Sequence, residues 1–133
     1  MQTIVVGYDG SEPANRALDR ATELVDDGGT VVLVSAVHLL GGKGGMGFDP
    51  IEKEDFDRQL DTAKSRLTEK GIATRTIEGL GDAARVITEQ AKDSDADLVV
   101  VGNGHKNFLE RILFGSVSAG VSHRTNCDVL VVD

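Results

Sequence analysis

The stretch of sequence that decides the fold is DLVVVGNGHKNFLERILFGSVS, which spans Asp97–Ser118. It begins with the aliphatic run Leu98–Val101, and a turn sequence with two glycines, Gly102 and Gly104, follows directly. An uninterrupted apolar run bounded by turn residues is typical of a parallel strand that is buried on both faces. The stretch therefore predicts a parallel sheet with helices on both sides.

The same stretch also predicts an anion site. Gly102 and Gly104 let the backbone approach a ligand closely, because glycine has no Cβ atom. Gly115 and Ser116 stand where the next helix should begin, and a helix N-terminus offers unpaired N–H groups and a partial positive charge. We therefore expect a phosphate group to bind between these two elements, at the carboxyl edge of the sheet.

Outside this stretch, strand and helix patterns alternate along the chain. Apolar runs predict strands over 4–6, 30–37, 74–78, 97–101 and 129–132, and amphipathic periodicity predicts helices over 11–25, 50–70, 83–91 and 116–124. This order predicts a single α/β domain over residues 1–133, with a doubly wound five-stranded parallel sheet and helices on both faces. Asp9 and Gly102 then follow two strands at the edge where ligands bind, near the reversal of strand order.

The composition excludes several classes of partner. The net charge is −8, from 14 Lys and Arg against 22 Asp and Glu, so nucleic acid and anionic membranes would be repelled.

No apolar run reaches the length of a membrane span and the first residues do not form a signal peptide, so a cytoplasmic location is expected. Abundant Asp, with six Lys against eight Arg, also fits a halophilic source.

Several motifs together resemble the universal stress protein family. The spacing from Gly102 to Gly115 and Ser116 is similar to that family's nucleotide loop, Gly-x-x-Gly, nine residues, Gly-Ser/Thr. The opening IVVGYDGSE, the internal EGLGDAA and ADLVVVG, and the closing NCDVLVV are similar as well, so the resemblance covers essentially the whole chain. It implies a Rossmann-like sheet of strand order 3-2-1-4-5 and a regulatory or stress-response module that binds ATP or AMP, with Mg²⁺ as an accompanying ion.

The resemblance also implies which residues hold the nucleotide. Backbone N–H groups of two segments, 102–105 and 115–118, would hold the phosphates, and the base would lie near the ends of the first two strands. The implied set is Tyr8, Asp9, Ala36, Val101, Gly102, Gly104, His105, Gly115, Ser116, Val117 and Ser118. Each position has a structural alternative: Asp9 can stabilise the start of the first helix, Ala36 and Val101 can be plain core, and the loop can simply connect strand to helix.

The sequence departs from the family's loop at one position. Counting back nine residues from Gly115 places the family's second glycine at His105, and the glycine stands one place earlier, at Gly104. A histidine there could obstruct a positive φ or the approach of a phosphate. It could instead donate a hydrogen bond to the phosphate, with Gly104 forming the turn. A family member that has lost nucleotide binding and acts only as a dimeric partner is therefore the alternative.

A second glycine motif, GLGDAA at 79–84, matches the dinucleotide fingerprint between a strand and a helix. That fingerprint also requires an acidic residue at the end of the next strand. The next strand here ends in Val101 and Gly102, and its aspartate, Asp97, comes before it. We therefore interpret these glycines as turn residues, and a small dinucleotide-dependent enzyme is the weakest alternative.

No catalytic motif can be named. The sequence contains no P-loop and no GxSxG elbow, and His38, His105 and His123 are widely separated. We therefore expect no enzyme, although the resemblance leaves slow ATP hydrolysis open. The single cysteine, Cys127, excludes an internal disulfide and is expected to be a small buried residue.

The remaining prediction concerns pairing of the last strand with a second chain. The resemblance implies homodimerisation through Val129–Val132, and an apolar strand at the edge of a sheet is open to pairing with another chain. The alternative is an ordinary edge strand that is shielded by the flanking Asp128 and Asp133.

Overall fold

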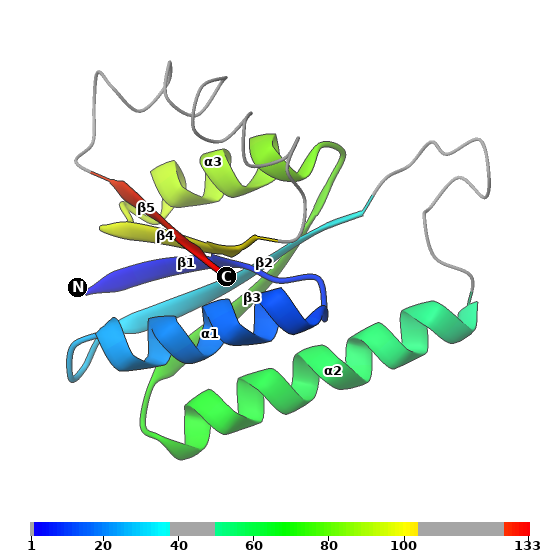
Figure 1. The fold of residues 1–133 in the computed structure, drawn as a ribbon, viewed down its shortest axis with the longest axis horizontal. Helices are drawn as coiled ribbons and strands as arrows, with labels where there is room; N and C mark the ends of the chain where they lie inside the picture. The colour runs from blue at the N-terminus through cyan, green and yellow to red at the C-terminus, as the bar shows by residue number, and fades with distance from the viewer. Residues whose placement is uncertain (1, 38–49, 104–126) are drawn as a thin grey trace.

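The computed structural model describes residues 2–37, 50–103 and 127–133 (Figure 1). Its elements are β1 (Thr3–Gly7), α1 (Glu12–Leu24), β2 (Thr30–Val37), α2 (Pro50–Glu69), β3 (Ala73–Leu80), α3 (Ala83–Asp93), β4 (Leu98–Gly102) and β5 (Asp128–Val132). The strands form one five-stranded sheet of order β3-β2-β1-β4-β5, and every neighbouring pair is parallel. The predicted fold class and strand order are therefore confirmed, and the helix predicted over 116–124 lies outside the described residues.

Local sequence signals explain where the helices begin and end. The Ser11 hydroxyl accepts a hydrogen bond from the Ala14 N–H at 3.3 Å, and Pro13 occupies the first turn of α1, where its missing N–H costs nothing. Gly71, with φ of +78°, follows α2 and allows the chain to leave the helix. The ranges predicted for these two helices, 11–25 and 50–70, are therefore close to those observed, Glu12–Leu24 and Pro50–Glu69.

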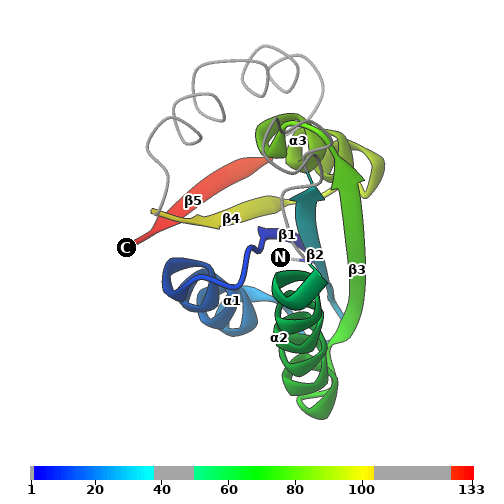
Figure 2. The same cartoon turned by 90° about the vertical axis from the view of Figure 1, so that its right-hand side faces the viewer.

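The helices cover both faces of the sheet (Figure 2). Helices α1 and α2 lie on one face, and α3 lies on the other. Because side chains alternate along a strand, Leu98 and Val100 of β4 belong to the core under α1 and α2, whereas Val99 and Val101 belong to the core under α3. The predicted burial of this strand on both faces is therefore confirmed.

Helix α3 packs directly on glycines of two strands. A Cβ atom at Gly7 of β1 would lie 2.7 Å from Cδ1 of Ile87, and a Cβ atom at Gly79 of β3 would overlap the side chain of Val86. Ile87 and Val86 are both buried residues of α3. The two glycines therefore make the room into which these side chains fit.

The amino edge of the sheet is held by one carboxylate. Oδ2 of Asp97 accepts hydrogen bonds from the backbone N–H groups of Gln2 at 2.7 Å and of Thr3 at 3.0 Å. Both hydrogen bonds lower the pKa of Asp97, and the bond from Thr3 has the larger effect. The carboxylate that precedes β4 thus fixes the start of β1, at the opposite end of the strands from the predicted site.

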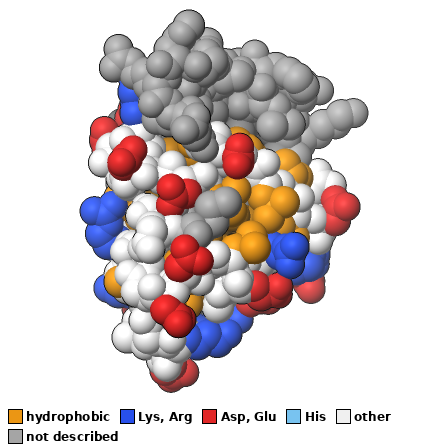
Figure 3. Space-filling view, turned by 90° about the vertical axis from the view of Figure 1, so that its left-hand side faces the viewer, with side chains coloured by type: hydrophobic (Ala, Val, Ile, Leu, Met, Phe, Trp, Pro, Cys, Tyr) orange, Lys and Arg blue, Asp and Glu red, His pale blue; other side chains and the backbone are white. Residues whose placement is uncertain are grey.

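The strand β5 forms one edge of the sheet and carries exposed apolar surface. Val129, Leu130, Val131 and Val132 are all only half-buried. Hydrophobic side chains gather on the side of the molecule where β5 lies (Figure 3). The strand predicted over 129–132 is thus confirmed and lies at an edge of the sheet. Its pairing with a second chain stays a prediction.

Candidate functional site

The carboxyl ends of β1 and β4 form the centre of the candidate site. The two strands pair directly, with Val6 opposite Val100, and the strand order reverses between them. Asp9 follows β1 and Gly102 ends β4. In open parallel sheets, ligands bind outside the carboxyl ends of the strands at such a reversal. The predicted pairing of the two strands that Asp9 and Gly102 follow is therefore confirmed, and a ligand site at their ends stays a prediction.

Asp9 has a structural role in the turn before α1. Its Oδ1 atom accepts hydrogen bonds from the Ser11 N–H at 2.9 Å and from the Ser11 hydroxyl. Ser11 in turn caps α1, so Asp9 orients the cap and places a negative charge near the positive end of the helix. This matches the structural alternative considered for Asp9, and its contact with a ligand stays a prediction.

Gly102 is also required by packing. A Cβ atom at this position would lie 2.5 Å from the carbonyl carbon of Pro13 and 2.6 Å from its carbonyl oxygen. Because that neighbour is backbone, a side chain at position 102 would force α1 away from the end of β4. The first glycine of the predicted loop therefore has a reason to be glycine whether or not a ligand binds.

The structure does not bring Tyr8 and Val101 to the same side of the sheet. Tyr8 is buried under α1 and α2, where its hydroxyl donates to Oδ1 of Asn15 at 2.8 Å and its ring centroid lies 6.4 Å from that of Phe56. This burial raises the pKa of Tyr8. Val101 and Ala36 belong to the core under α3. The side chain of Tyr8 and those of Ala36 and Val101 are thus separated by the sheet.

The remaining predicted site residues cannot be placed. Gly104, His105, Gly115, Ser116, Val117 and Ser118 lie outside the described residues. The phosphate-binding part of the site thus stays a prediction from the sequence, while its flanking elements, β1 and β4, are described.

The sequence analysis did not predict the hydrogen bonds that Asp133 makes at this edge of the sheet. Nδ2 of Asn103 donates to Oδ1 of Asp133 at 2.6 Å, and Nε of Arg16 donates to the backbone oxygen of Asp133 at 2.7 Å. The N–H of Asn103 also donates to the Val132 carbonyl at 2.9 Å. The sequence predicts only a shielding charge at Asp133, and no periodicity or motif indicates a role for Arg16.

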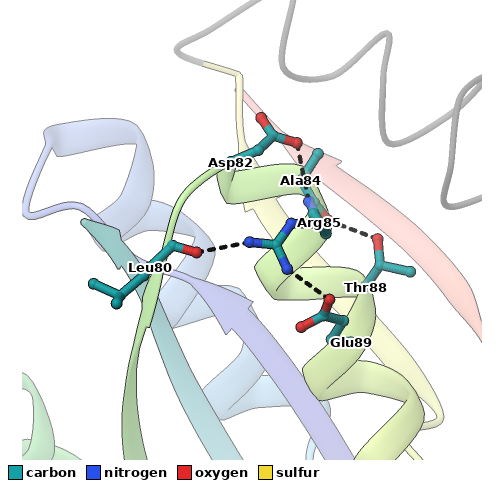
Figure 4. Close-up of polar contacts among 6 residues, drawn as sticks. All are labelled: Leu80, Asp82, Ala84, Arg85, Thr88 and Glu89. Atoms are coloured by element: carbon teal, nitrogen blue, oxygen red, sulfur yellow. Dashed lines mark hydrogen bonds and ion pairs between the residues drawn. The ribbon is translucent and has the colours of Figure 1, made fainter. Parts of the chain in front are cut away.

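The GLGDAA motif at 79–84, which matches the dinucleotide fingerprint, forms the turn between β3 and α3 (Figure 4). The Asp82 carboxylate accepts from the Arg85 N–H at 3.2 Å and so caps α3 where an anion would otherwise bind. The Arg85 guanidinium donates to the Leu80 carbonyl at 2.8 Å, and a Cβ atom at Gly81 would lie 2.7 Å from its Nη2. Gly81 has a φ of +104°, which supports its interpretation as a turn residue.

A polar cleft of about 560 Å³ opens between α1 and α2. Its lining includes Tyr8, Asn15, Arg58 and Arg66. Arg58 pairs with Asp55, and Arg66 pairs with Asp19 of α1. Because these ion pairs offset both guanidinium charges, the cleft offers an anion little net attraction.

The described part of the chain contains no candidate metal centre. Within 2–37, 50–103 and 127–133, no cluster of three or more His, Cys, Asp or Glu side chains could hold a metal ion. Cys127 is half-buried, and burial raises the pKa of its thiol to about 11, so it stays protonated near neutral pH. Among the helices of the described ranges, none has the length and apolar character that crossing a bilayer would need.

The chain belongs to the universal stress protein family, whose sequence model matches residues 1–133. Among similar proteins, universal stress protein YxiE of Bacillus subtilis is 30% identical over 144 residues, which cover 97% of this chain and 97% of that protein. The resemblance stated from the sequence motifs is therefore confirmed at the level of the family.

Solved structures of the family agree in fold. A universal stress family protein from Burkholderia pseudomallei has a TM-score of 0.71 and 30% identity, covering 98% of this chain and 95% of that chain. A universal stress protein solved in complex with cAMP has a TM-score of 0.66 and 28% identity, covering 99% of this chain and 97% of that chain. At least one similar protein of the same fold thus binds an adenine nucleotide.

Proposed function

We propose that this protein is a nucleotide-binding universal stress protein that binds ATP or AMP at the carboxyl edge of its sheet. The observation that carries the proposal is the pairing of β1 with β4 at the strand reversal, because Asp9 follows the first of these strands and Gly102 ends the second. A ligand at such a reversal is the general expectation for an open parallel sheet. The cAMP complex of a 28% identical relative supports an adenine nucleotide as the ligand.

The proposed site combines described and sequence-predicted residues. The Asp9 carboxylate accepts from the ribose or the base, and the backbone at Gly102 and Gly104, together with Gly115–Ser118, donates to the phosphates. Mg²⁺ accompanies ATP on its phosphate oxygens. Because Tyr8 is buried with its hydroxyl bonded to Asn15, any contribution of Tyr8 comes from its backbone rather than from its ring.

The protein acts as a regulatory module in the cytoplasm rather than as an enzyme. This part of the proposal rests on the sequence, which offers no nucleophile–base pair for chemistry. The net charge of −8 also supports function at high salt, where screening weakens the repulsion between like charges.

The module works as a homodimer through Val129–Val132. Support comes from β5, which is one of the two edge strands of the sheet and whose four apolar residues are only half-buried. Antiparallel pairing of two such edges would satisfy the outer backbone groups and cover the apolar side chains. Sedimentation of the parent and of Leu130→Lys measures this directly: a monomeric parent would contradict the dimer.

A second function is favoured by one observation, namely His105 at the place of the family's second glycine. In this alternative the protein binds no nucleotide and acts only as a dimeric interaction partner. A single titration with nucleotide distinguishes these two functions.

The experiment is calorimetric titration of the purified, nucleotide-stripped protein with ATP, AMP and cAMP, repeated on His105→Gly and Gly115→Val. Binding by the parent that Gly115→Val abolishes is the result expected from the proposed phosphate loop. Gly115→Val must melt at the temperature of the parent for this comparison to hold. An inert parent with a binding His105→Gly variant would leave the nucleotide-free dimer as the function.

A further inference from the structure

Every second residue of β5 directs its backbone groups toward β4. The Asp128 N–H donates to the Asp97 carbonyl at 3.2 Å, and the Val132 carbonyl accepts from the Asn103 N–H at 2.9 Å. In a parallel pair, alternate residues of a strand bond to the same neighbour. Leu130 therefore belongs to the same set as Asp128 and Val132.

The residues between them, Val129 and Val131, direct their N–H and C=O groups toward the outer edge of the sheet. Among the described strands, β5 has a neighbour on one side only, namely β4 (Figure 2). Val129 and Val131 pack on the core under α3, and Leu130 and Val132 pack on the core under α1 and α2. The edge thus combines outward backbone groups with half-buried apolar side chains on both faces, which suits another β-strand.

A second copy of this chain fits this edge in a limited set of registers. Two identical edge strands that are related by a two-fold axis pair antiparallel, with the axis normal to the sheet. Such an axis keeps each side chain on its own face of the sheet, so it pairs one central residue with its own copy. Within the strand, that central residue can be Val129, Leu130 or Val131.

A contact of Asp133 disfavours the register centred on Val131. In that register the N–H of Val129 has to donate to the backbone oxygen of the partner's Asp133. That oxygen already accepts from Nε of Arg16 at 2.7 Å. The side chain of Arg16 therefore competes with a partner strand for this acceptor.

The register centred on Val129 is disfavoured by burial. It places the Asp128 carboxylate opposite the partner's Leu130 and leaves Val132 outside the paired region. The register centred on Leu130 uses the whole strand instead, because Val129 then meets the partner's Val131. All the apolar residues of β5 lie within the paired region, and Asp128 stands at its exposed end.

We propose that β5 pairs with β5 of a second copy in the register centred on Leu130, and that Arg16 selects this register by holding the Asp133 oxygen. The inference rests on the homodimer of the proposed function and names the residues that meet in it. Each meeting of Val129 with Val131 is a hydrogen-bonded pair, since both residues direct their backbone groups outward. Leu130 meets its own copy in a pair without backbone hydrogen bonds, on the face that carries α1 and α2.

Single cysteines in the full chain map the register. Each is placed in a Cys127→Ser background, so that the introduced thiol is the only one. Leu130→Cys meets its own copy with Cα atoms about 4.5 Å apart, which a disulfide can span. Val129→Cys and Val131→Cys each lie roughly 8 Å from their own copies in this register, which a disulfide cannot span without backbone movement.

Mild oxidation followed by non-reducing electrophoresis measures the rate of linking. Leu130→Cys should form a covalent dimer at least about tenfold faster than Val129→Cys or Val131→Cys, since only its thiols lie within bonding reach. The double variant Val129→Cys with Val131→Cys should link as well, because these two positions face each other. Asp27→Cys is the control for random collision, because it places a thiol on the exposed turn after α1.

The role of Arg16 has its own test. Arg16→Ala frees the Asp133 oxygen, so Val131→Cys should then link with its own copy. Arg20→Ala is the matched control, because it removes another exposed arginine of α1, which pairs with Glu23 at 2.9 Å. It should leave Val131→Cys unlinked. A Val131→Cys thiol that stays unlinked in Arg16→Ala would overturn the part assigned to Arg16.

The remaining outcomes separate the register from the dimer, with sedimentation of each reduced variant as the measure of assembly. Rapid linking of Leu130→Cys is the supporting result. A dimeric protein in which Val129→Cys or Val131→Cys links instead would overturn the register and leave the homodimer standing. A monomeric parent, or a dimer in which none of these thiols links faster than Asp27→Cys, would overturn both the register and pairing through β5. Nucleotide binding is tested separately, by the calorimetric titration.

Discussion

The Cα atom of Gly102 lies so close to the backbone of Pro13 that a Cβ atom added there would be 2.5 Å from the Pro13 carbonyl carbon. This contact sets the first turn of α1 against the end of β4. It gives the glycine that opens the predicted nucleotide loop a packing role of its own. Loss of binding after a substitution at Gly102 would therefore say nothing about the ligand until the stability of the variant is known.

The first prediction follows from this contact. Gly102→Ala should lower the free energy of unfolding by about 1–3 kcal/mol, the usual range for overpacking. Urea denaturation measures the change. Gly28→Asn is the control, because a Cβ atom at Gly28 meets nothing within 4 Å and asparagine tolerates its φ of +81°. A Gly102→Ala variant as stable as the parent would disprove the contact.

The second prediction concerns the pH dependence of stability through Asp97. Hydrogen bonds from Thr3 and Gln2 lower the pKa of Asp97 in the folded protein, so its stabilising effect is complete above the unfolded value of about 3.9 and is lost as the pH falls through the folded value. Asp97→Ala should therefore melt below the parent at pH 7, and the difference should shrink below about pH 4.

Asp27→Ala is the control for Asp97, because it removes one exposed carboxylate from the turn after α1. Melting curves of the parent and both variants between pH 7 and pH 3 make the comparison. A difference between the parent and Asp97→Ala that stays constant over this range would show that the carboxylate does not hold the start of β1.

The third prediction separates Tyr8 from the ligand. Tyr8→Phe removes the hydrogen bond to Asn15 and keeps the ring against Phe56, so it should cost about 0.5–1.5 kcal/mol of stability. Nucleotide affinity should change by less than about twofold, the scatter expected when no contact is lost. Urea denaturation and titration of the same sample measure both quantities. A large loss of affinity at unchanged stability would place the Tyr8 hydroxyl in the site.

The fourth prediction concerns the turn between β3 and α3. Asp82→Ala removes the cap of α3 and should lower stability by about 1 kcal/mol. Because the Asp82 carboxylate occupies the helix N-terminus, NADH should not bind the parent. Fluorescence titration with NADH provides the measurement, and saturable binding by the parent would revive the dinucleotide interpretation.

Much of the fold was predictable from the sequence because its strands are short apolar runs between turn residues. The strand over 30–37 is observed with those bounds, and the helix predicted over 50–70 is observed as Pro50–Glu69. β3 extends beyond the predicted 74–78 to Ala73–Leu80, because it pairs with the whole length of β2. Pairing with a neighbour lengthened this strand, and a single sequence carries no signal of it.

The site was less predictable for two physical reasons. A strand that is apolar on both faces has no alternation, so nothing in the sequence assigns Tyr8 to one face and Val101 to the other. Nε of Arg16 donates to the backbone oxygen of Asp133, 117 positions away, and neither periodicity nor a local motif predicts such a contact. The adjacency of β1 and β4, which Asp9 and Gly102 follow, was predictable because it depends on strand order alone.

The packing of α3 on two glycines of the sheet restricts how this helix can move. Val86 and Ile87 occupy the space left by Gly79 and Gly7, which belong to strands on either side of β2. Sliding α3 along the sheet would drive these side chains into neighbouring residues that carry Cβ atoms, so the helix is locked in register with the strands. Among the helices of the described ranges, α3 is therefore the one expected to keep its position on the sheet when a ligand binds, and it can serve as the frame in which movement of α1 and α2 is measured.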